Sequence, residues 1–170
     1  ALPIFDTLAT PAALVAGTVI SAAVITDLPP MVKWATAIIA GTMGAKRTSE
    51  LIPFCHPLML DAVDISIQLT GKNTVEILCS VKTEGKTGVE MEALAGANAA
   101  LLTIWDLTKM VEPDLKIDGV RLLAKVGGKS GLWLNPAGVP EWVRDKVSPK
   151  PAQMLKGITA SFITLSDRAA

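Results

Sequence analysis

The sequence predicts an α+β fold in which helices pack on one face of a ferredoxin-like antiparallel sheet. The apolar residues along the chain form patterns that are typical, in order, of a strand, a helix, a hairpin, a long helix and a strand. Half of the 170 residues are hydrophobic and 19% are charged, which is typical of a folded domain and excludes a disordered chain. An order that mixes antiparallel pairs with helices favours a sheet covered on one face by its helices.

The first elements are identified from prolines, small residues and β-branched residues. Pro11 opens a short predicted helix that Gly17 ends, because proline suits a first helical turn. Residues 18–25 are rich in Val, Ile and Thr, which predicts a strand. Residues 32–43 are apolar and small, so we expect a helix that packs closely against a neighbour.

A hairpin, a long helix and a further strand follow. Apolar and polar residues alternate over 63–69 and again over 75–79, on either side of Gly71, and this pattern predicts a β-hairpin. Residues 89–111 contain no proline and predict a long helix with an apolar interior. Residues 117–125 predict the next strand.

Composition divides the chain into three parts. Residues 1–134 form the predicted main domain. Residues 135–155 contain the prolines, charges and short breaks that are typical of a linker. Residues 156–170 begin with an apolar, β-branched run, so we expect the first strand of a second, truncated domain there.

Charge and cysteine content limit the classes of partner. Lys plus Arg and Asp plus Glu each total 16, so no overall field favours nucleic acid or an anionic membrane. The charge-free stretch 7–26 is diluted by threonine, proline and glycine, which makes it a poor membrane span. Cys55 and Cys79 lack the paired spacing of a zinc site or a disulfide framework. We expect a cytoplasmic protein with no nucleic-acid or membrane partner and no metal site.

Residue types that carry chemistry cluster in four ordered segments. They are A-K-R-T-S-E-L-I-P-F-C-H-P-L at 45–58, K-T-G-V-E-M-E-A-L at 86–94, T-I-W-D-L-T-K-M at 103–110 and R-L-L-A-K-V-G-G-K-S-G at 121–131. Together they resemble the cyclic pyranopterin monophosphate synthase family, the molybdenum cofactor biosynthesis protein C family. Four ordered motifs make chance agreement remote, whereas one short motif would be weak.

The resemblance implies an enzyme of molybdenum cofactor biosynthesis. Such a lyase of the phosphorus–oxygen type converts 3′,8-cyclo-7,8-dihydroguanosine 5′-triphosphate, a GTP derivative, to cyclic pyranopterin monophosphate and pyrophosphate. No redox change is needed, so acids, bases and a cationic phosphate cradle suffice. We expect no cofactor, with Mg²⁺ possible beside the phosphates. The resemblance also implies a homo-oligomer, a hexamer of three dimers with sites between subunits.

Phe54, Cys55 and His56 lie between Pro53 and Pro57, where stiff extended backbone presents them to a ligand. A lone histidine is more often structural than catalytic, but the resemblance implies that these three residues line the substrate site. A Cys-His nucleophilic pair is the alternative. Adjacent residues on an extended segment point to opposite sides, so we expect substrate contact.

Glu90 and Glu92 flank Met91 in the predicted first turn of the long helix, where carboxylates interact favourably with the helix dipole. For Glu90 this structural role and substrate binding carry equal weight. For Glu92 we favour function, since a carboxylate can accept paired N–H hydrogen bonds from a guanine-like ring. The resemblance implies that Met91 and Glu92 contact the substrate.

Asp106 and Lys109 are spaced i, i+3, so they could form an ordinary surface ion pair. They interrupt an apolar helix, and we therefore expect partial burial, which can tune a lysine for proton transfer. The resemblance implies that Asp106 is the catalytic aspartate and Lys109 the catalytic lysine. Glu92 would lie about 21 Å away along the same helix, which predicts sites assembled from two subunits.

Local cations must hold the triphosphate in a chain without net charge. Lys46, Lys125 and Lys129 are predicted to bind phosphate, together with Arg47, although each alone could be an ordinary surface residue. The G-G-K-S-G run at 127–131 lacks the spacing of a nucleotide P-loop.

The chain departs from the family near residue 30. The family carries a catalytic lysine at the position of Pro30, and Lys33 follows three residues later. Either Lys33 serves in its place, or the chain is a catalytically impaired assembly module with the synthase fold. The tail at 157–170, G-I-T-A-S-F-I-T-L-S-D-R-A-A, resembles the opening strand and S-D-R turn of the molybdopterin-binding, protein B-like family, which predicts a fusion.

Overall fold

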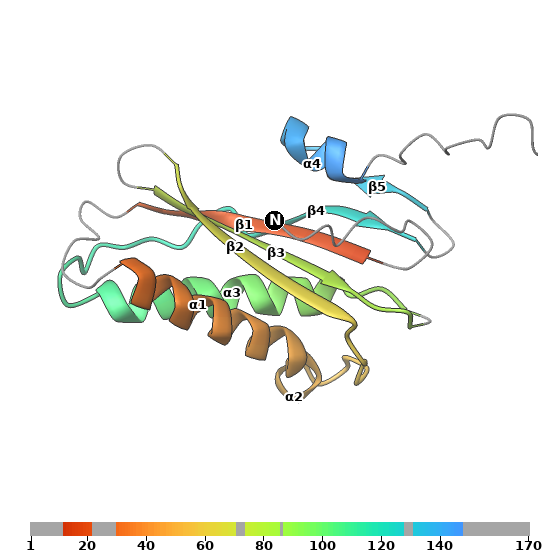
Figure 1. Cartoon of the computed structure of the whole chain (residues 1–170), viewed down its shortest axis with the longest axis horizontal. Coiled ribbons are helices and arrows are strands. Elements are labelled where there is room, and N and C mark those ends of the chain that lie inside the picture. The colour runs from red at the N-terminus through yellow and green to blue at the C-terminus, as the bar shows by residue number, and fades with distance from the viewer. Residues whose placement is uncertain (1–11, 22–29, 71–73, 86, 128–130, 148–170) are drawn as a thin grey trace, which may run out of the picture.

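The computed structural model describes residues 12–21, 30–70, 74–85, 87–127 and 131–147. A five-stranded sheet in the order β2-β3-β1-β4-β5 carries two long helices on one face and a short helix on the other (Figure 1). The strand pairs along this order are antiparallel. The predicted α+β class, with the long helices together on one face, is therefore confirmed.

The elements follow the chain in nearly the predicted order. The strands are β1 (Ala12–Ser21), β2 (Ala62–Leu69), β3 (Thr74–Lys82), β4 (Arg121–Val126) and β5 (Trp133–Leu134), and the helices are α1 (Pro30–Lys46), α2 (Thr48–Leu51), α3 (Glu90–Thr108) and α4 (Glu141–Val147). The predicted hairpin is β2–β3, and the two predicted long helices are α1 and α3. The predicted strand at 117–125 corresponds to β4, which begins and ends slightly later.

β1 corrects the expectation of a short helix after Pro11. Ala12 to Gly17 lie in the strand, between β3 on one side and β4 on the other. A central strand gains hydrogen bonds along both edges, and this tertiary pairing outweighs the weak local preference of a run such as A-A-L-V-A for a helix. The strand predicted over 18–25 therefore begins earlier, and its last residues lie outside the described residues.

α4 lies within the segment that we expected to be a linker. Its two valines, spaced i, i+4, are buried against the sheet face opposite the long helices, in a second core cluster of Leu78, Leu123, Ala124, Val143 and Val147. This spacing places both side chains on one helix face, and proline and charge in the flanking sequence obscured that signal. The tail at 156–170, with its expected strand, lies outside the described residues.

The main core lies between the sheet and the antiparallel pair α1 and α3 (Figure 1). The two helices approach closely because glycine occupies their contacts. A Cβ on Gly44 of α1 would lie 2.6 Å from the Cβ of Ala99, and a Cβ on Gly96 of α3 would lie 3.1 Å from the carbonyl oxygen of Gly41. This packing fixes α3, the helix that carries most of the candidate site residues.

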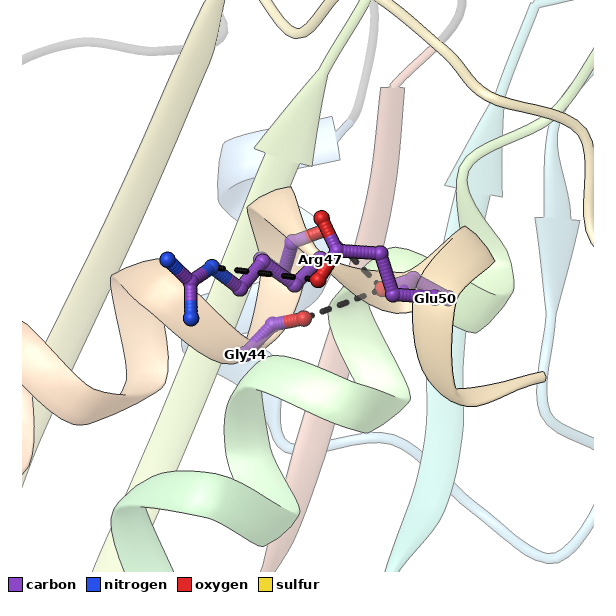
Figure 2. Close-up of polar contacts among 5 residues, drawn as sticks. Gly44, Arg47 and Glu50 are labelled. Carbon is purple, nitrogen blue, oxygen red and sulfur yellow. Dashed lines mark hydrogen bonds and ion pairs between the residues drawn. The ribbon is translucent and has the colours of Figure 1, made fainter.

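The junction of α1 and α2 precedes the loop at residues 53–57 that carries Cys55 and His56, which we call the Cys-His loop. The backbone amide of Arg47 donates to the Gly44 carbonyl oxygen at 3.3 Å, and the Arg47 side chain lies beside Glu50 (Figure 2). That ion pair is long, 4.0 Å, and exposed, so it contributes little to stability. Thr48 is buried and its hydroxyl donates to the Ala45 carbonyl oxygen at 2.9 Å. The buried Thr48 hydroxyl therefore helps to fix the turn between α1 and α2.

Candidate functional site

The Cys-His loop follows α2 directly. The Cys55 amide donates to the carbonyl oxygen of Ile52 at 3.0 Å, which forms a turn. Phe54 and His56 are exposed, whereas Cys55 is half-buried. The neighbouring side chains therefore lie in different environments, although Pro53 and Phe54 lie in a turn rather than in the expected extended backbone.

Cys55 contacts the buried carboxylate of Glu92 at the start of α3. The Cys55 Sγ lies 3.6 Å from Oε1 of Glu92, whose residue is 3% exposed. Burial raises the pKa of the Cys55 thiol, the charge and hydrogen bond of Glu92 raise it further, and a backbone hydrogen bond at His56 lowers it. A thiol held protonated is a poor nucleophile, which favours substrate contact over the Cys-His nucleophilic alternative.

Glu90 and Lys125 form an ion pair near the same end of α3. The Lys125 Nζ lies 3.0 Å from Oε1 of Glu90, and both side chains are partly buried. A Cβ on Gly88 would collide with the Glu90 carboxylate, so the glycine of the K-T-G motif leaves room for this pair. The structure thus joins two predicted substrate-binding residues and ties β4 to α3.

Thr83 supports this end of the molecule, and sequence analysis missed it. Its buried hydroxyl donates to the carbonyl oxygen of Met59 at 2.7 Å and accepts from the amide of Gly85 at 3.0 Å. These bonds join the chain after the Cys-His loop to the turn that precedes α3. The signal in the sequence was a threonine placed directly after the alternating strand.

Asp106 and Lys109 form a second cluster at the opposite end of α3. The Lys109 Nζ lies 2.6 Å from Oδ1 of Asp106, and the two side chains are 45% and 65% exposed respectively. The expectation of partial burial is therefore wrong for the single chain. Ile104 and Thr108 are the buried residues of this turn, so Asp106 and Lys109 occupy the outward face of the helix.

The structure does not bring the two clusters together within one chain. Glu92 and Asp106 share α3, as predicted, and lie about 21 Å apart along its axis at ~1.5 Å per residue. Met91 is partly exposed beside Glu92, and Lys46 is exposed at the last residue of α1. Lys129 lies outside the described residues.

The position of the family lysine is occupied by Pro30, the first residue of α1. Lys33, three residues further along that helix, is 1% exposed, and no side-chain hydrogen bond or ion pair joins it to another described residue. α1 begins at the end of the molecule where α3 finishes (Figure 1). Lys33 is therefore on the side of the Asp106–Lys109 cluster, but within the packed interior of the chain.

The described residues form neither a metal site nor a membrane-spanning helix. In this part of the chain, no group of three or more His, Cys, Asp or Glu side chains is arranged to hold a metal ion. None of the described helices is long and apolar enough to cross a membrane.

Comparisons with known proteins agree with the motif positions. The chain is 50% identical over 135 residues to a molybdenum cofactor biosynthesis bifunctional protein of Synechococcus elongatus, covering 79% of this chain and 40% of that protein. It is 57% identical over 98 residues to a cyclic pyranopterin monophosphate synthase of Helicobacter pylori strain HPAG1, covering 56% of this chain and 61% of that protein. The chain thus spans about 40 to 61% of the length of these relatives.

The family comparison covers most of the described core. The model of the MoaC family matches residues 16–128, from β1 through β4. This range includes the candidate site residues at both ends of α3, Glu90 and Glu92 at its start and Asp106 and Lys109 at its end. The match extends over more than half of the 170 residues, and the chain therefore belongs to the MoaC family.

Proposed function

We propose that this protein is a cyclic pyranopterin monophosphate synthase of molybdenum cofactor biosynthesis. It would convert 3′,8-cyclo-7,8-dihydroguanosine 5′-triphosphate to cyclic pyranopterin monophosphate and pyrophosphate. The observation that carries the proposal is the 2.6 Å contact between Lys109 and Asp106 on an outward helix end, in a chain of the MoaC family. The Helicobacter pylori relatives bear the name of this synthase.

The proposed chemistry is acid–base work with a leaving pyrophosphate. Lys109 transfers protons during ring opening and phosphate attack, because an ammonium group can donate and its amine can accept. Asp106 accepts a hydrogen bond from Lys109 and orients it. Lys46, Lys125 and Lys129 hold the phosphates, and Lys125 exchanges its present partner, Glu90, for a phosphate oxygen when substrate binds.

The guanine-like base of the substrate is held at the Glu92 end of α3, opposite to the end that carries Lys109. Glu92 accepts N–H hydrogen bonds from the guanine-like ring, since a carboxylate offers two acceptor oxygens. Phe54, His56 and Met91 are exposed around it and supply the remaining contacts. Cys55 contacts Glu92 directly.

The protein acts as a homo-oligomer in this proposal, a hexamer of three dimers. The outward surface of the two long helices is apolar, with Met31, Ile39 and Leu102 80%, 65% and 59% exposed. Large exposed apolar patches are typical of protein–protein interfaces. A two-fold contact through these helices brings the Glu92 end of one α3 to the Asp106 end of its partner, so each site takes residues from two chains.

Two wider aspects of the proposal concern the location of the protein and its domain organisation. The protein is cytoplasmic, and residues 156–170 begin a second, molybdopterin-binding domain. The relative of Synechococcus elongatus is named a bifunctional protein, which supports a fusion of this kind.

Purified protein supplied with the cyclised GTP derivative tests the activity. We expect equal amounts of pyrophosphate and cyclic pyranopterin monophosphate, measured by phosphate release and mass spectrometry. Lys109→Met should lower kcat by about 10² to 10⁴, the contribution typical of an acid–base group. Lys116→Met, an exposed lysine outside both clusters, should retain activity. A folded wild-type protein that forms no product would instead support the impaired assembly module.

A further inference from the structure

The start of α3 lacks the usual caps. Its N-cap residue is Val89, which makes no side-chain capping hydrogen bond, and valine is among the poorest residues for this position. Glu92 occupies the third helical position, where glutamate commonly turns back to the N-cap amide. The hydrogen bond that the structure gives to the Glu92 side chain comes instead from Cys55. Local departures of this kind are expected at functional sites.

Both partners of this contact are held from outside. The Cys55 backbone is fixed by the hydrogen bond from its amide to Ile52 and by a proline two residues away on either side. Glu92 is anchored on α3, whose Gly96 packs directly against Cys79 of β3. The Sγ–Oε1 distance of 3.6 Å is therefore set by packed elements.

The direction of the hydrogen bond follows from the chemistry of the two groups. A carboxylate accepts only, through about four lone-pair positions, and a thiol is its donor here. Burial and the negative charge of Glu92 raise the pKa of Cys55, so the S–H is present at neutral pH. One lone pair on Oε1 is occupied, and the described residues give this carboxylate no second side-chain hydrogen bond.

We propose that Cys55 is a positioning residue, whose S–H donates to Oε1 of Glu92 and fixes the orientation of that carboxylate toward the N–H edge of a bound guanine-like base. The identity of the base rests on the proposed function. The Cys55–Glu92 hydrogen bond itself does not, and one arm of the test is independent of turnover.

The first arm measures alkylation of Cys55 by iodoacetamide against pH, in the intact chain, with peptide mass spectrometry. Glu92→Gln removes the charge that raises the thiol pKa, so the alkylation profile should shift to lower pH. Glu76→Gln, on β3 and paired with Gln68, should leave the profile in place. Buried Cys79 serves as the unreactive reference. An unshifted profile in Glu92→Gln overturns the proposal.

The second arm measures kcat and KM. Cys55→Ala should raise KM by about tenfold, the effect of one hydrogen bond to a charged group, and change kcat far less. Cys55→Ser should recover most of the loss, because its hydroxyl still donates. Because Glu92→Gln is expected to be inactive, the double mutant is compared by substrate affinity: in the Glu92→Gln background, Cys55→Ala should cause no further loss of substrate binding in titration calorimetry.

Two results in this arm contradict a positioning role. If Cys55→Ser is as impaired as Cys55→Ala, or if the losses of substrate affinity in Cys55→Ala and Glu92→Gln add in full, Cys55 acts on the substrate without Glu92. A wild-type protein without turnover contradicts the proposed function alone, and the alkylation arm then decides the hydrogen bond.

Discussion

Cys79 illustrates how burial determines the chemistry of one side chain. It lies on β3 beneath Gly96, fully buried. Burial raises the pKa of Cys79 to about 12, the charge of Asp64 adds to the effect, and a backbone hydrogen bond at Ala97 opposes it. This thiol is therefore inert, in contrast to Cys55, whose half-buried position allows contact with Glu92.

The raised pKa of Cys79 predicts a loss of stability at alkaline pH. The stabilisation that Cys79 provides through this shift is fully present below the unfolded pKa of about 9.0. It falls as pH rises toward the folded pKa of about 12, by up to about 1.4 kcal/mol per pH unit. Urea unfolding of wild type and Cys79→Ala between pH 8 and about 10.5 measures it. The mutant should lose this slope while lysine contributions, common to both, cancel. If the unfolding free energies of wild type and Cys79→Ala have the same pH dependence, the raised pKa of Cys79 is contradicted.

Local spacing predicted which residues meet better than it predicted their burial. The spacing of Asp106 and Lys109 predicted their contact, which the structure confirms. It did not reveal which helix face the sheet covers, and so the expected burial was wrong. The Cys55–Glu92 contact joins residues 37 positions apart, and such a pair depends on tertiary packing that no local pattern contains.

At the scale of elements, the close contact of α1 and α3 decides where the site residues lie. Gly44 faces Ala99 and the carbonyl oxygen of Ala95, at 2.6 and 3.0 Å from the position of an added Cβ. Neither contact can move freely, because one atom is a buried-face methyl and the other is helix backbone. The glycine is required by this approach of the two helices.

Gly44→Ala should therefore destabilise the protein despite the better helix propensity of alanine. Overpacking costs about 1 to 3 kcal/mol, and the propensity gain returns at most about 1 kcal/mol, for a net loss of up to about 2 kcal/mol. Thr36→Ala, on the exposed face of the same helix, should change stability by less than about 0.7 kcal/mol. Thermal and urea unfolding measure both. A stabilised Gly44→Ala protein would show that the helices can separate without cost.

Alternation predicted the hairpin, and long apolar runs without an internal proline predicted both long helices. These patterns failed for β1 and α4. In β1 the alanine-rich run at 12–16 has no strong local preference, and pairing on both edges by β3 and β4 decides its conformation. In α4 only Val143 and Val147 are buried, and two apolar residues do not establish a period.

For the whole molecule, the outward apolar surface of α1 and α3 predicts self-association. Ile39→Asp places a charge in the middle of this surface and should shift the protein to smaller species, since an unpaired buried charge is costly. Gln68→Asp, exposed on β2 away from both helices, should leave the assembly unchanged. Sedimentation velocity compares the assembly size of the two variants with that of wild type. Identical sedimentation of wild type and Ile39→Asp would place any interface elsewhere.

Sequence motifs predicted the family, and the order of elements predicted the α+β class. The arrangement of subunits remains a prediction, because it depends on surfaces that meet only between chains. Its strongest support is geometric: Glu92 and Asp106 project from opposite ends of one helix, about 21 Å apart, which exceeds the reach of one small ligand.

Subunit mixing tests this composite site most directly. Glu92→Gln and Asp106→Asn, each expected to fold and to be inactive, are combined under conditions of demonstrated subunit exchange. If each site takes Glu92 from one chain and Asp106 from its partner, half of the two-fold pairs are mixed and half of their sites are intact. Activity should return to roughly a quarter of wild type. Activity that stays at the level of the single mutants would contradict the composite site and place both residues in one chain's own site.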